Sequence, residues 1–594
     1  MNKKADYCFE VSWEVCNKVG GIFTVVKSKA ARMVEYYHEN YYLIGPYFHD
    51  KALGQFIEGT PEHSFREAAD SLKSQGITCH FGKWRGDGEP NVILIDFESF
   101  RGKINDIKKE LWEYFKVDSI RAGNDYDEPV AFAYASGKVI ESLSGALHNK
   151  KVVAHFHEWL SGAGLLYLKS RSAKVATVFT THATILGRTL ASSGIDIYNV
   201  WDKINPEEEA KKHSIESKFT IEKQSALNAD AFTTVSEITA MEAEHMLGRK
   251  ADVLVLNGLD IEKFPSFEDA SIHHRIMRDK MREFLEYYFF PYYSFDLNQS
   301  LNFFTCARYE FHDKGINIMI KALGNLNRRL MQEKSSKTIV AFFFVPADVR
   351  SMKPEIIENR TNYQDIKGSF DDSLEDIKRN IMRILLSGKK ISEETVFSKE
   401  FVSEVKGKLS RFKRKGLPPV CTHDLHAPKD DILHGLWQEG LNNGENSRVK
   451  VIFYPIYLTG ADNLLNLSYY EAIEAGHLGI FPSYYEPWGY TPLEAGSLGV
   501  ASVTTDLAGF GRFFCAECRQ GDEAGIFIVK RLNKTEDDAV RQLEDVMYRY
   551  SQFSQNERID NKLQARKIAA TADWKLFIKN YIEAHNKAIE KAFG

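Results

Sequence analysis

The sequence has few cysteines and no long hydrophobic run. Its seven cysteines are scattered through 594 residues, an odd and sparse number that fits reduced thiols and argues against a disulfide framework. No apolar stretch approaches the ~20 residues of a membrane span. Residues 1–4 lead directly into a predicted strand without the apolar core of a signal peptide. These absences predict a cytoplasmic protein with no membrane partner.

A strong excess of one charge is also missing. The formal net charge is -5, which argues against a general nucleic-acid partner. Neither an internal repeat nor a low-complexity tract is present, and the 43% hydrophobic and 27% charged content is that of a globular protein. The composition therefore predicts a folded protein and leaves its ligand open.

Cys515 and Cys518 form the only C-x-x-C motif of the chain. Such a motif could be a redox pair or half of a metal site. No second C-x-x-C and no suitably spaced Cys/His pair follows it, so the spacing does not indicate a metal.

Short apolar runs alternate with stretches long enough for helices. A chain of 594 residues exceeds the size at which one core stops growing, so at least two domains are expected. The alternation predicts an α/β fold with two doubly wound, Rossmann-like parallel sheets facing a cleft. The predicted strands are 7–11, 92–95, 152–155, 175–180, 232–235 and 253–256 in the first sheet, and 302–306, 338–345, 449–454, 477–481, 501–504 and 525–529 in the second.

Four segments follow from this pattern. Residues 1–261 form the first domain, 262–300 a linker helix, and 301–565 the second domain, which carries a charged helical insertion at about 349–420. Residues 566–594 form a last helix, and their apolar residues recur at helical spacing. This stripe needs a surface to pack on, and the first domain is predicted to supply it.

One stretch, residues 483–496, joins a predicted strand to a short helix. Thr491 is the predicted N-cap, Pro492 suits the first turn, and Gly499 can close the far end. Because Gly489 precedes the helix, free N–H groups and the positive end of the helix dipole can face an anion such as a phosphate.

Two glutamates frame that helix start. Glu486 lies in the loop and Glu494 about one turn inside the helix, so they can meet different parts of one ligand. Taken alone, the pattern equally describes a capped turn with two solvated acids.

Further polar residues follow other predicted strands, where ligands of open parallel sheets bind. Arg308 and Lys314 follow strand 302–306 and offer the planar fork and the point charge that suit a diphosphate. A solvated surface pair is the alternative for these two cations.

The first predicted domain contributes its own candidates. His182 and Arg188 follow strand 175–180, where a histidine can bond a sugar hydroxyl or be an ordinary polar loop residue. Lys18 precedes Gly20 and Gly21, and two glycines between strand and helix let a phosphate approach the backbone. Together the two domains indicate a cleft for a nucleotide diphosphate sugar, and the cations would stabilise the departing diphosphate in glycosyl transfer.

These residues carry a resemblance to a known family. The sequence resembles glycogen synthases of the animal and fungal type from near the N-terminus to the last helix. The stretches that carry it are 17–22, 155–160, 180–188, 308–310, 314–315, 422–423 and 482–494. The resemblance implies a GT-B fold and transfer of glucose from UDP-glucose to an α-1,4-glucan with retention of configuration. It also implies that no metal or other cofactor is used and that the protein forms a homo-oligomer such as a tetramer.

Roles for single residues come from the same resemblance. The implied catalytic set is Glu486, His182, Arg308 and Lys314. The implied donor-binding set is Lys18, Gly20, Gly21, Arg188, Gly489, Tyr490, Thr491 and Glu494. Within them, Glu486 lies by the transferred glucose, Glu494 binds the ribose, and Tyr490 stacks on the uracil. A same-face attack by the acceptor hydroxyl fits a site rich in cations, and Glu486 is not assigned as a covalent nucleophile.

The sequence departs from the family at one place. Residues 558–567 hold few arginines where the animal and fungal enzymes carry a dense cluster that binds glucose 6-phosphate, and the chain ends at Gly594. We therefore expect activity without glucose 6-phosphate and no phosphorylated tails. Two alternatives stay open: a transferase that uses ADP-glucose or another acceptor, and a glucan-binding scaffold without catalysis. Four residues, Arg308, Lys314, Glu486 and Glu494, count against the scaffold, because a binding module has no need of all of them.

Overall fold

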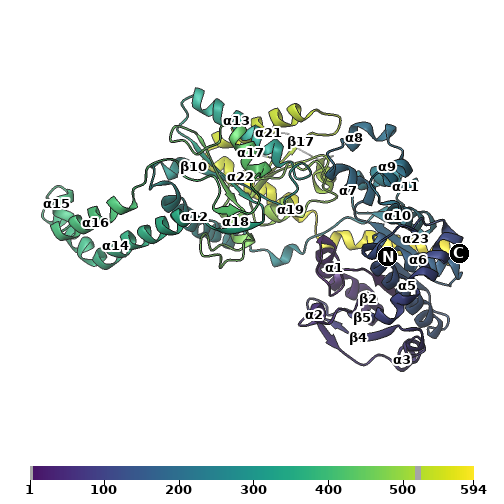
Figure 1. Ribbon diagram of the computed structural model, residues 1–594. Coiled ribbons are helices and arrows are strands. Elements are labelled where there is room, and N and C mark those ends of the chain that lie inside the picture. The colour runs from purple at the N-terminus through teal and green to yellow at the C-terminus, as the bar shows by residue number, and fades with distance from the viewer. Residues whose placement is uncertain (1–4, 516–523) are drawn as a thin grey trace.

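The computed structural model describes residues 5–515 and 524–594 and contains two large β-sheets, each covered by helices (Figure 1). The first sheet has nine strands in the order β3-β4-β5-β2-β1-β6-β7-β8-β9. They are β1 (Tyr7–Val11), β2 (Tyr41–Pro46), β3 (Phe56–Glu58), β4 (Thr78–Trp84), β5 (Asn91–Asp96), β6 (Val152–His157), β7 (Ala176–Thr181), β8 (Ala231–Thr234) and β9 (Val253–Leu254).

All six strands predicted for this half are present, but the sheet is not purely parallel. The strand β4 runs antiparallel to both β3 and β5, so the prediction is wrong at this edge. Three strands, β2, β3 and β4, were not predicted. The residues of β4 are only partly buried, and a strand of this kind lacks the continuous apolar run that marks a buried parallel strand.

The second sheet has six strands, and every pairing in it is parallel. Its order is β14-β11-β10-β15-β16-β17. The strands are β10 (Ser300–Cys306), β11 (Thr338–Phe344), β14 (Val449–Tyr454), β15 (Leu478–Ile480), β16 (Ala501–Thr505) and β17 (Ile526–Val529). They confirm the six predicted runs to within two residues at each end. β11 and β14 are buried along their whole length, as strands with helices on both faces must be.

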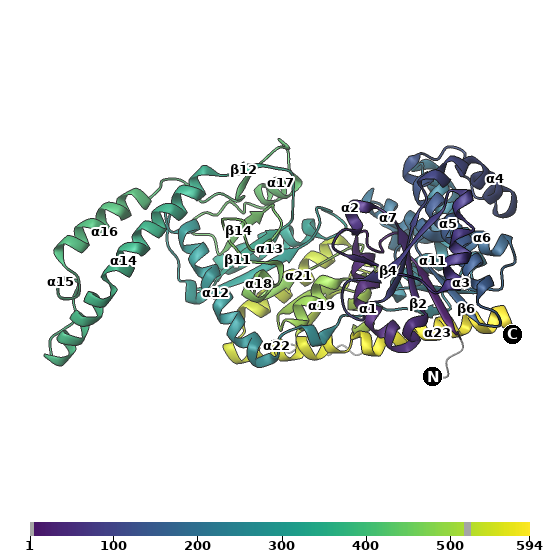
Figure 2. The same ribbon diagram turned by 90° about the horizontal axis from the view of Figure 1, so that it is seen from below.

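A helical insertion interrupts the second half between two short strands. β12 (Val349–Met352) pairs antiparallel with β13 (His423–Leu425). Between them lie α14 (Pro354–Leu386), α15 (Glu393–Val396) and α16 (Lys399–Phe412), which project away from both sheets (Figures 1 and 2). The base of α14 packs on α12 (Phe267–Phe289), where Tyr363 donates a hydrogen bond of 2.5 Å to Glu286. The predicted helical insertion is confirmed.

The last helix, α23 (Trp574–Phe593), crosses from the second half to the first and covers its sheet (yellow in Figure 1). Trp574, Phe577 and Tyr581 are buried in a cluster that also contains Val153 and Val178 of the first sheet. The indole N–H of Trp574 donates to Ser28 Oγ at 2.8 Å. The predicted return of this helix is thereby confirmed.

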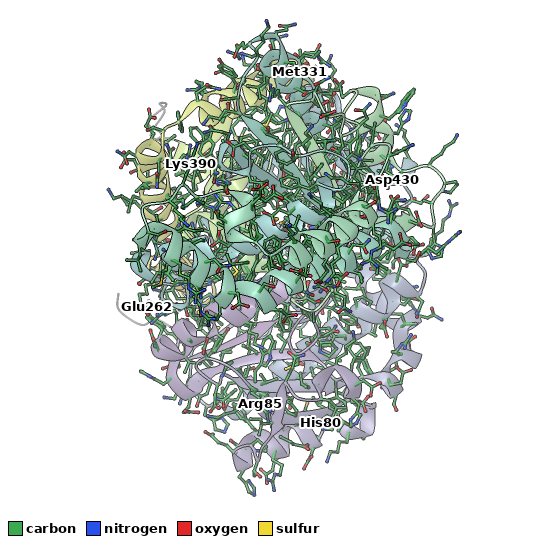
Figure 3. All side chains as sticks on the ribbon, turned by 90° about the vertical axis from the view of Figure 1, so that its left-hand side faces the viewer. His80, Arg85, Glu262, Met331, Lys390 and Asp430 are labelled. Carbon is green, nitrogen blue, oxygen red and sulfur yellow. The ribbon has the colours of Figure 1, made fainter. Side chains whose placement is uncertain are left out.

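The two halves are distinct bodies in the side view of Figure 3. His80 and Arg85 mark the first half, Met331 and Asp430 the second, and Glu262 lies near the border. Lys390 marks the tip of the insertion, which points toward the viewer.

Two sequence-based expectations concern cysteines and membranes. Five cysteines of the described residues are free, namely Cys8, Cys16, Cys79, Cys306 and Cys421. Cys518 and the side chain of Cys515 lie outside the described part of the chain. Within residues 5–515 and 524–594, no helix is long and apolar enough to cross a membrane.

Candidate functional site

The strand order reverses at one place in each sheet, and several of the predicted site residues follow the strands at these places. In the first sheet the reversal lies between β1 and β6, and in the second between β10 and β15. Ligands of open α/β sheets bind beyond the carboxyl ends of such strands. Arg308 and Lys314 follow β10, and Glu486 follows β15. The topology therefore brings residues 172 positions apart to one edge.

Lys314 and Glu486 form an ion pair at that edge. Lys314 Nζ lies 2.5 Å from Glu486 Oε2, and their side chains are 15% and 22% exposed. The pair is thus partly shielded from water but still reachable by a ligand. Gly315 follows directly, with φ +67°, and a Cβ there would lie 2.0 Å from the carbonyl oxygen of Pro482. Only glycine lets this loop lie so close to the 483–496 loop.

Arg308 has a different setting. Its side chain is 70% exposed, and its guanidinium lies 2.9 Å from Glu310 Oε1. Glu310 also lies 3.9 Å from Lys314 Nζ. The two predicted cations therefore share an acid, but only Lys314 contacts Glu486 in this arrangement.

The helix of the motif, α19 (Tyr490–Ser497), begins earlier than the sequence predicted. Its N-cap is Gly489, with φ +101°, so the prediction of Thr491 as N-cap is wrong. The left-handed glycine turns the chain two residues sooner, which only glycine does without strain. Pro492 still falls among the first helical positions, where a missing N–H costs nothing. Gly499, with φ +71°, follows the other end as predicted.

Glu494 and Tyr490 both lie on this helix. Glu494 accepts hydrogen bonds from Tyr469 at 2.7 Å and Tyr470 at 3.3 Å. Burial raises the pKa of Glu494 to about 6, and the two hydroxyls oppose that rise. The hydroxyl of Tyr490 donates to the carbonyl oxygen of Gly258 at 3.2 Å, so Tyr490 spans the two halves.

His182 lies at the carboxyl end of β7 and is held by a residue that the sequence reasoning missed. The backbone N–H groups of His182 and Ala183 donate to Glu158 Oε1 at 2.8 and 3.1 Å. Glu158 adopts a φ of +64°, a strained value outside glycine. Burial raises the pKa of Glu158 to about 7, although the nearby positive charge of Arg188 lowers it. The Arg188 side chain itself is exposed. The signal for Glu158 was its position directly after β6 at the reversal point.

The Gly-Gly loop of the first half is already bonded to an acid of the chain. Glu14 Oε2 accepts hydrogen bonds from the N–H groups of Gly20 at 2.7 Å and Phe23 at 2.9 Å, at the start of α1 (Gly21–Tyr37). A phosphate would have to take the place of this carboxylate to reach those N–H groups. Lys18, Gly20 and Gly21 are exposed, and their contact with a donor stays a prediction.

Comparison with known proteins identifies the family. A family model described as "Glycogen synthase" matches residues 10–594. The chain belongs to the glycogen synthase family. It is 38% identical over 591 residues to "Glycogen [starch] synthase" of Dictyostelium discoideum, covering 98% of this chain and 67% of that protein. It is 36% identical over 587 residues to the liver "Glycogen [starch] synthase" of Mus musculus, covering 98% and 83%. The predicted resemblance is confirmed.

The fold class has a counterpart among solved structures. The catalytic domain of starch synthase IV from Arabidopsis thaliana, bound to ADP and acarbose, matches with a TM-score of 0.50 at 13% identity, over 99% of this chain and 100% of that one. At this identity the likeness concerns the fold alone. The GT-B architecture is confirmed by it, and glycosyl transfer by membership of the glycogen synthase family.

In this member of the glycogen synthase family, buried acids surround the loop that carries His182. Glu242 accepts hydrogen bonds from Thr184 Oγ1 at 2.5 Å and from the Tyr485 hydroxyl at 2.9 Å. Glu222 accepts from the N–H of Ile185 at 2.9 Å. Burial raises the pKa of Glu242 to about 7 and that of Glu222 well above its usual value. Tyr485 precedes Glu486, so Glu242 ties the motif loop to the first half.

A second contact supports the same junction. The Tyr484 hydroxyl donates to Asp196 Oδ1 at 2.7 Å. Ser192 Oγ donates to Asp313 Oδ2 at 2.9 Å, one residue before Lys314. The residues that precede Lys314 and Glu486 in the sequence thus contact the first half directly.

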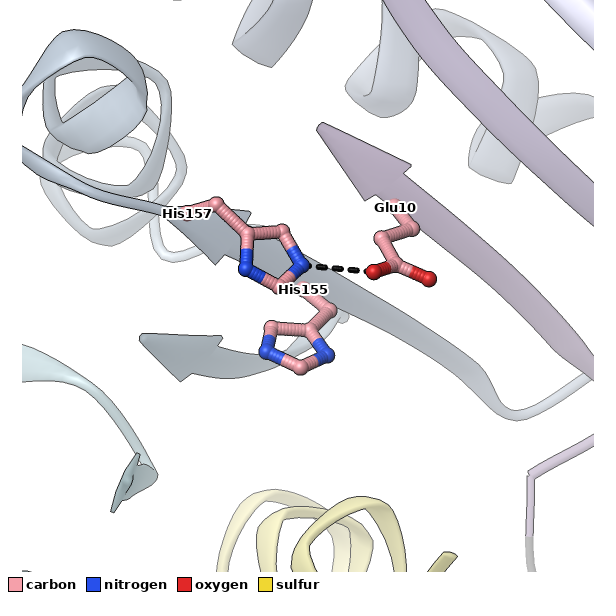
Figure 4. Close-up of side chains that lie close together, drawn as sticks. All are labelled: Glu10, His155 and His157. Atoms are coloured by element: carbon pink, nitrogen blue, oxygen red, sulfur yellow. Dashed lines mark hydrogen bonds and ion pairs between the residues drawn. The ribbon is translucent and has the colours of Figure 1, made fainter. Parts of the chain in front are cut away.

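Glu10, His155 and His157 form the only group of potential metal ligands found among the described residues (Figure 4). Lys29 Nζ forms an ion pair with Glu10, and both side chains are fully buried. An added divalent cation would face this buried ammonium at close range. The site therefore does not fit a metal ion.

A separate group of cations surrounds α22 (Gln555–Ala570). Lys562 Nζ lies 2.6 Å from His274 Nδ1, and Arg278 donates to the carbonyl oxygen of Gly476 at 3.2 Å. Burial lowers the pKa of Lys562 to about 6, and Arg278 and Arg558 lower it further. Although residues 558–567 hold few arginines, cations from α12 and α22 gather here.

The carboxyl of Glu242 predicts a pH-dependent stability. Because its pKa is about 7 in the folded protein and the ordinary value is 4.5, the unfolded state ionises first as pH rises. The contribution of the protonated Glu242 carboxyl to the free energy of unfolding is complete below pH 4.5 and is lost as pH rises through 7. Between pH 5 and pH 8, the free energy of unfolding of Glu242→Gln should rise by about 2 to 3 kcal/mol relative to that of the parent. Unfolding curves of both proteins at both pH values measure this difference.

An exposed acid on the same helix supplies the control. Glu244→Gln alters a side chain on the outer face of α11 (Glu237–Leu247). This variant should follow the parent at both pH values. Equal pH dependence of Glu242→Gln and the parent would contradict the expectation.

Proposed function

We propose that the protein transfers glucose from UDP-glucose to the non-reducing end of an α-1,4-glucan such as glycogen, with retention of configuration. The observation that carries the proposal is the Lys314–Glu486 pair, 2.5 Å long, at the β10–β15 reversal of a glycogen synthase family chain. A scaffold that only binds glucan has no need of a half-buried ion pair at that edge.

The reaction requires stabilisation of the negative charge that develops on the departing diphosphate. Lys314 and the exposed Arg308 are proposed to hold the diphosphate, whose negative charge grows as the glucosyl bond breaks. Glu486, bonded to Lys314, is proposed to orient the transferred glucose from the other side. The acceptor hydroxyl attacks on the face that the diphosphate leaves, so the configuration is retained.

The remaining contacts follow the same arrangement. Glu494 is proposed to bind the ribose and Tyr490 to stack on the uracil, with Gly489 and Thr491 at the helix start. His182 would lie by the glucose, and Arg188 near the diphosphate. Lys18, Gly20 and Gly21 would close over the donor from the first half.

The role of Glu486 can be separated from donor binding. Glu486→Ala should lower kcat by about 100-fold or more, since it removes a group that positions the reacting sugar. The KM for the donor should change far less, because Lys314 and Glu494 remain. Steady-state rates with glycogen as acceptor measure both. Unchanged turnover in Glu486→Ala would contradict this role. Glu333→Ala, which alters an exposed side chain on the outer surface, is the control.

The donor is settled by a direct comparison. Incubation of the protein with glycogen and labelled UDP-glucose or ADP-glucose should put label into glycogen from UDP-glucose preferentially. Faster incorporation from ADP-glucose would support the rival donor. No incorporation from either, with glycogen still bound, would favour the scaffold. Equal rates with and without a chelator are expected, because no cofactor is proposed.

The insertion supports self-association. Met382, Leu385 and Leu386 near the end of α14 are 62%, 62% and 84% exposed. Exposed apolar residues at this helical spacing lie on one face, and such a face favours burial against another surface. We propose a homo-oligomer such as a tetramer, located in the cytoplasm.

Activity without glucose 6-phosphate is the regulatory expectation. Its premise is the small number of arginines in residues 558–567, whereas Arg278 and Arg558 keep positive charge beside Lys562, whose own pKa is lowered to about 6. We expect the rate with UDP-glucose to change less than twofold when glucose 6-phosphate is added. Strong activation, abolished in Lys562→Gln, would contradict the expectation and assign the cation group to the effector.

A further inference from the structure

A chain of buried hydrogen bonds leads from β1 to His182. Glu10 on β1 bonds His157 on β6, with Oε1 and Nε2 2.5 Å apart. His157 Nδ1 in turn lies 2.9 Å from His182 Nε2. All three side chains are buried. We call Glu10, His157 and His182 the relay, meaning a series of hydrogen bonds in which each residue fixes the proton position of the next.

Glu10 is the fixed end of this relay. Lys29 Nζ pairs with Oε1, and the Tyr41 hydroxyl donates to Oε2 at 2.5 Å. Although burial opposes ionisation, Lys29 and His157 hold the pKa of Glu10 well below its usual value. An ionised carboxylate can only accept hydrogen bonds. The proton between Glu10 and His157 therefore belongs to His157 Nε2.

His157 carries that proton and no second one. The charges of Glu10 and Lys29 already cancel, so an imidazolium would be an uncompensated buried charge. The ring of His155 also stacks on His157 at 4.4 Å, and burial lowers the pKa of both histidines. Neutral His157 with a proton on Nε2 has a lone pair on Nδ1. His182 must then donate from its own Nε2.

The last atom of the relay is His182 Nδ1. Since neutral His182 has its proton on Nε2, Nδ1 holds a lone pair. No hydrogen bond joins this atom to any residue in the parts of the chain that the structure describes. An unused acceptor at the end of β7, beside Glu158, suits a hydroxyl group of a sugar.

We propose that Glu10 and His157 are positioning residues that hold the proton of His182 on Nε2, so that Nδ1 accepts a hydrogen bond from a hydroxyl of the donor glucose. This step rests on the proposed function, which places His182 by the glucose. It adds two residues of the first sheet, neither of which reaches the substrate, to the reaction.

The tautomer is tested without any turnover. In protein labelled with ¹⁵N-histidine, two-bond proton–nitrogen correlation spectra distinguish a protonated ring nitrogen from a free one. The His182 signals, assigned by their loss in His182→Asn and independently in His182→Gln, should show a protonated Nε2 and a free Nδ1 between pH 6 and 8. A proton on Nδ1, or on both nitrogens, would overturn the proposal.

Kinetics test the link to substrate. His157→Gln removes the partner of His182 Nε2, and we expect kcat to fall about 10- to 100-fold, the range for one misplaced buried hydrogen bond. His155→Gln, in the neighbouring ring that bonds His585 and Thr180, is the matched control and should fall much less. Equal losses in both variants would mean a structural role only and would overturn the proposal.

A donor lacking one hydroxyl sharpens the readout. Among deoxyglucose analogues of the donor, the one that lacks the bonded hydroxyl should react more slowly than the normal donor with the parent protein. With His157→Gln the same analogue should react little more slowly still, because the variant and the analogue remove the same interaction. Strictly additive losses for every analogue would overturn the proposal. If neither UDP-glucose nor ADP-glucose is used at all, the proposed function fails, whereas the spectra still report the tautomer separately.

If His157→Gln does not fold, as judged by circular dichroism and melting, Glu10→Gln with Lys29→Met replaces it. This double variant removes both buried charges together and leaves no unpaired ion. It removes the fixed acceptor, so His182 should show a mixture of both tautomers. An unchanged single tautomer would contradict the relay.

Discussion

Parallel pairing is the constraint on which the site depends. Strands that run parallel need a crossover helix for each connection, and all their carboxyl ends therefore meet at one edge of the sheet. In the second sheet this brings the loops after β10 and β15 together, and with them Lys314 and Glu486. In the first sheet it places Glu14 after β1 and Glu158 after β6. The chemistry of the molecule is confined to these edges.

The two halves meet through residues of the motif itself. Tyr484 and Tyr485 reach Asp196 and Glu242 of the first half, while Glu486 between them and the helix bonds Lys314. Any movement of one half against the other must therefore shift the loop that holds Glu486. Domain position and active-site geometry are coupled by three consecutive residues.

The sequence predicts the strands well where most of their residues are apolar. The run 449–454 coincides with β14 and 7–11 with β1, because a strand buried on both faces is mostly apolar even where it carries one charged residue, Lys450 in β14 and Glu10 in β1. It fails for β4, whose neighbours run in the opposite direction. It also fails for the N-cap of α19, since the chain turns left-handed at Gly489 just after Glu486 has paired with Ala508, a residue distant in sequence.

The candidate site divides in the same way. Residues near a motif, such as Glu486 and Lys314, can be found from the chain alone. Glu14 and Glu158 are harder to find, although Glu158 directly follows a strand, because their importance comes from backbone N–H groups 6 to 25 positions away in the sequence. The charge state of Glu10 depends on Lys29, a partner 19 positions away that lies beside it only after folding.

The crossing of α23 has a consequence for biosynthesis. Val153, Val178 and Ala231 of the first sheet share a core with Trp574 and other residues of α23. These strands leave the ribosome early, yet their cover is translated only after the whole second half. The half that is made first is therefore the last to complete its core, and during elongation it exposes an apolar sheet face that chaperones recognise.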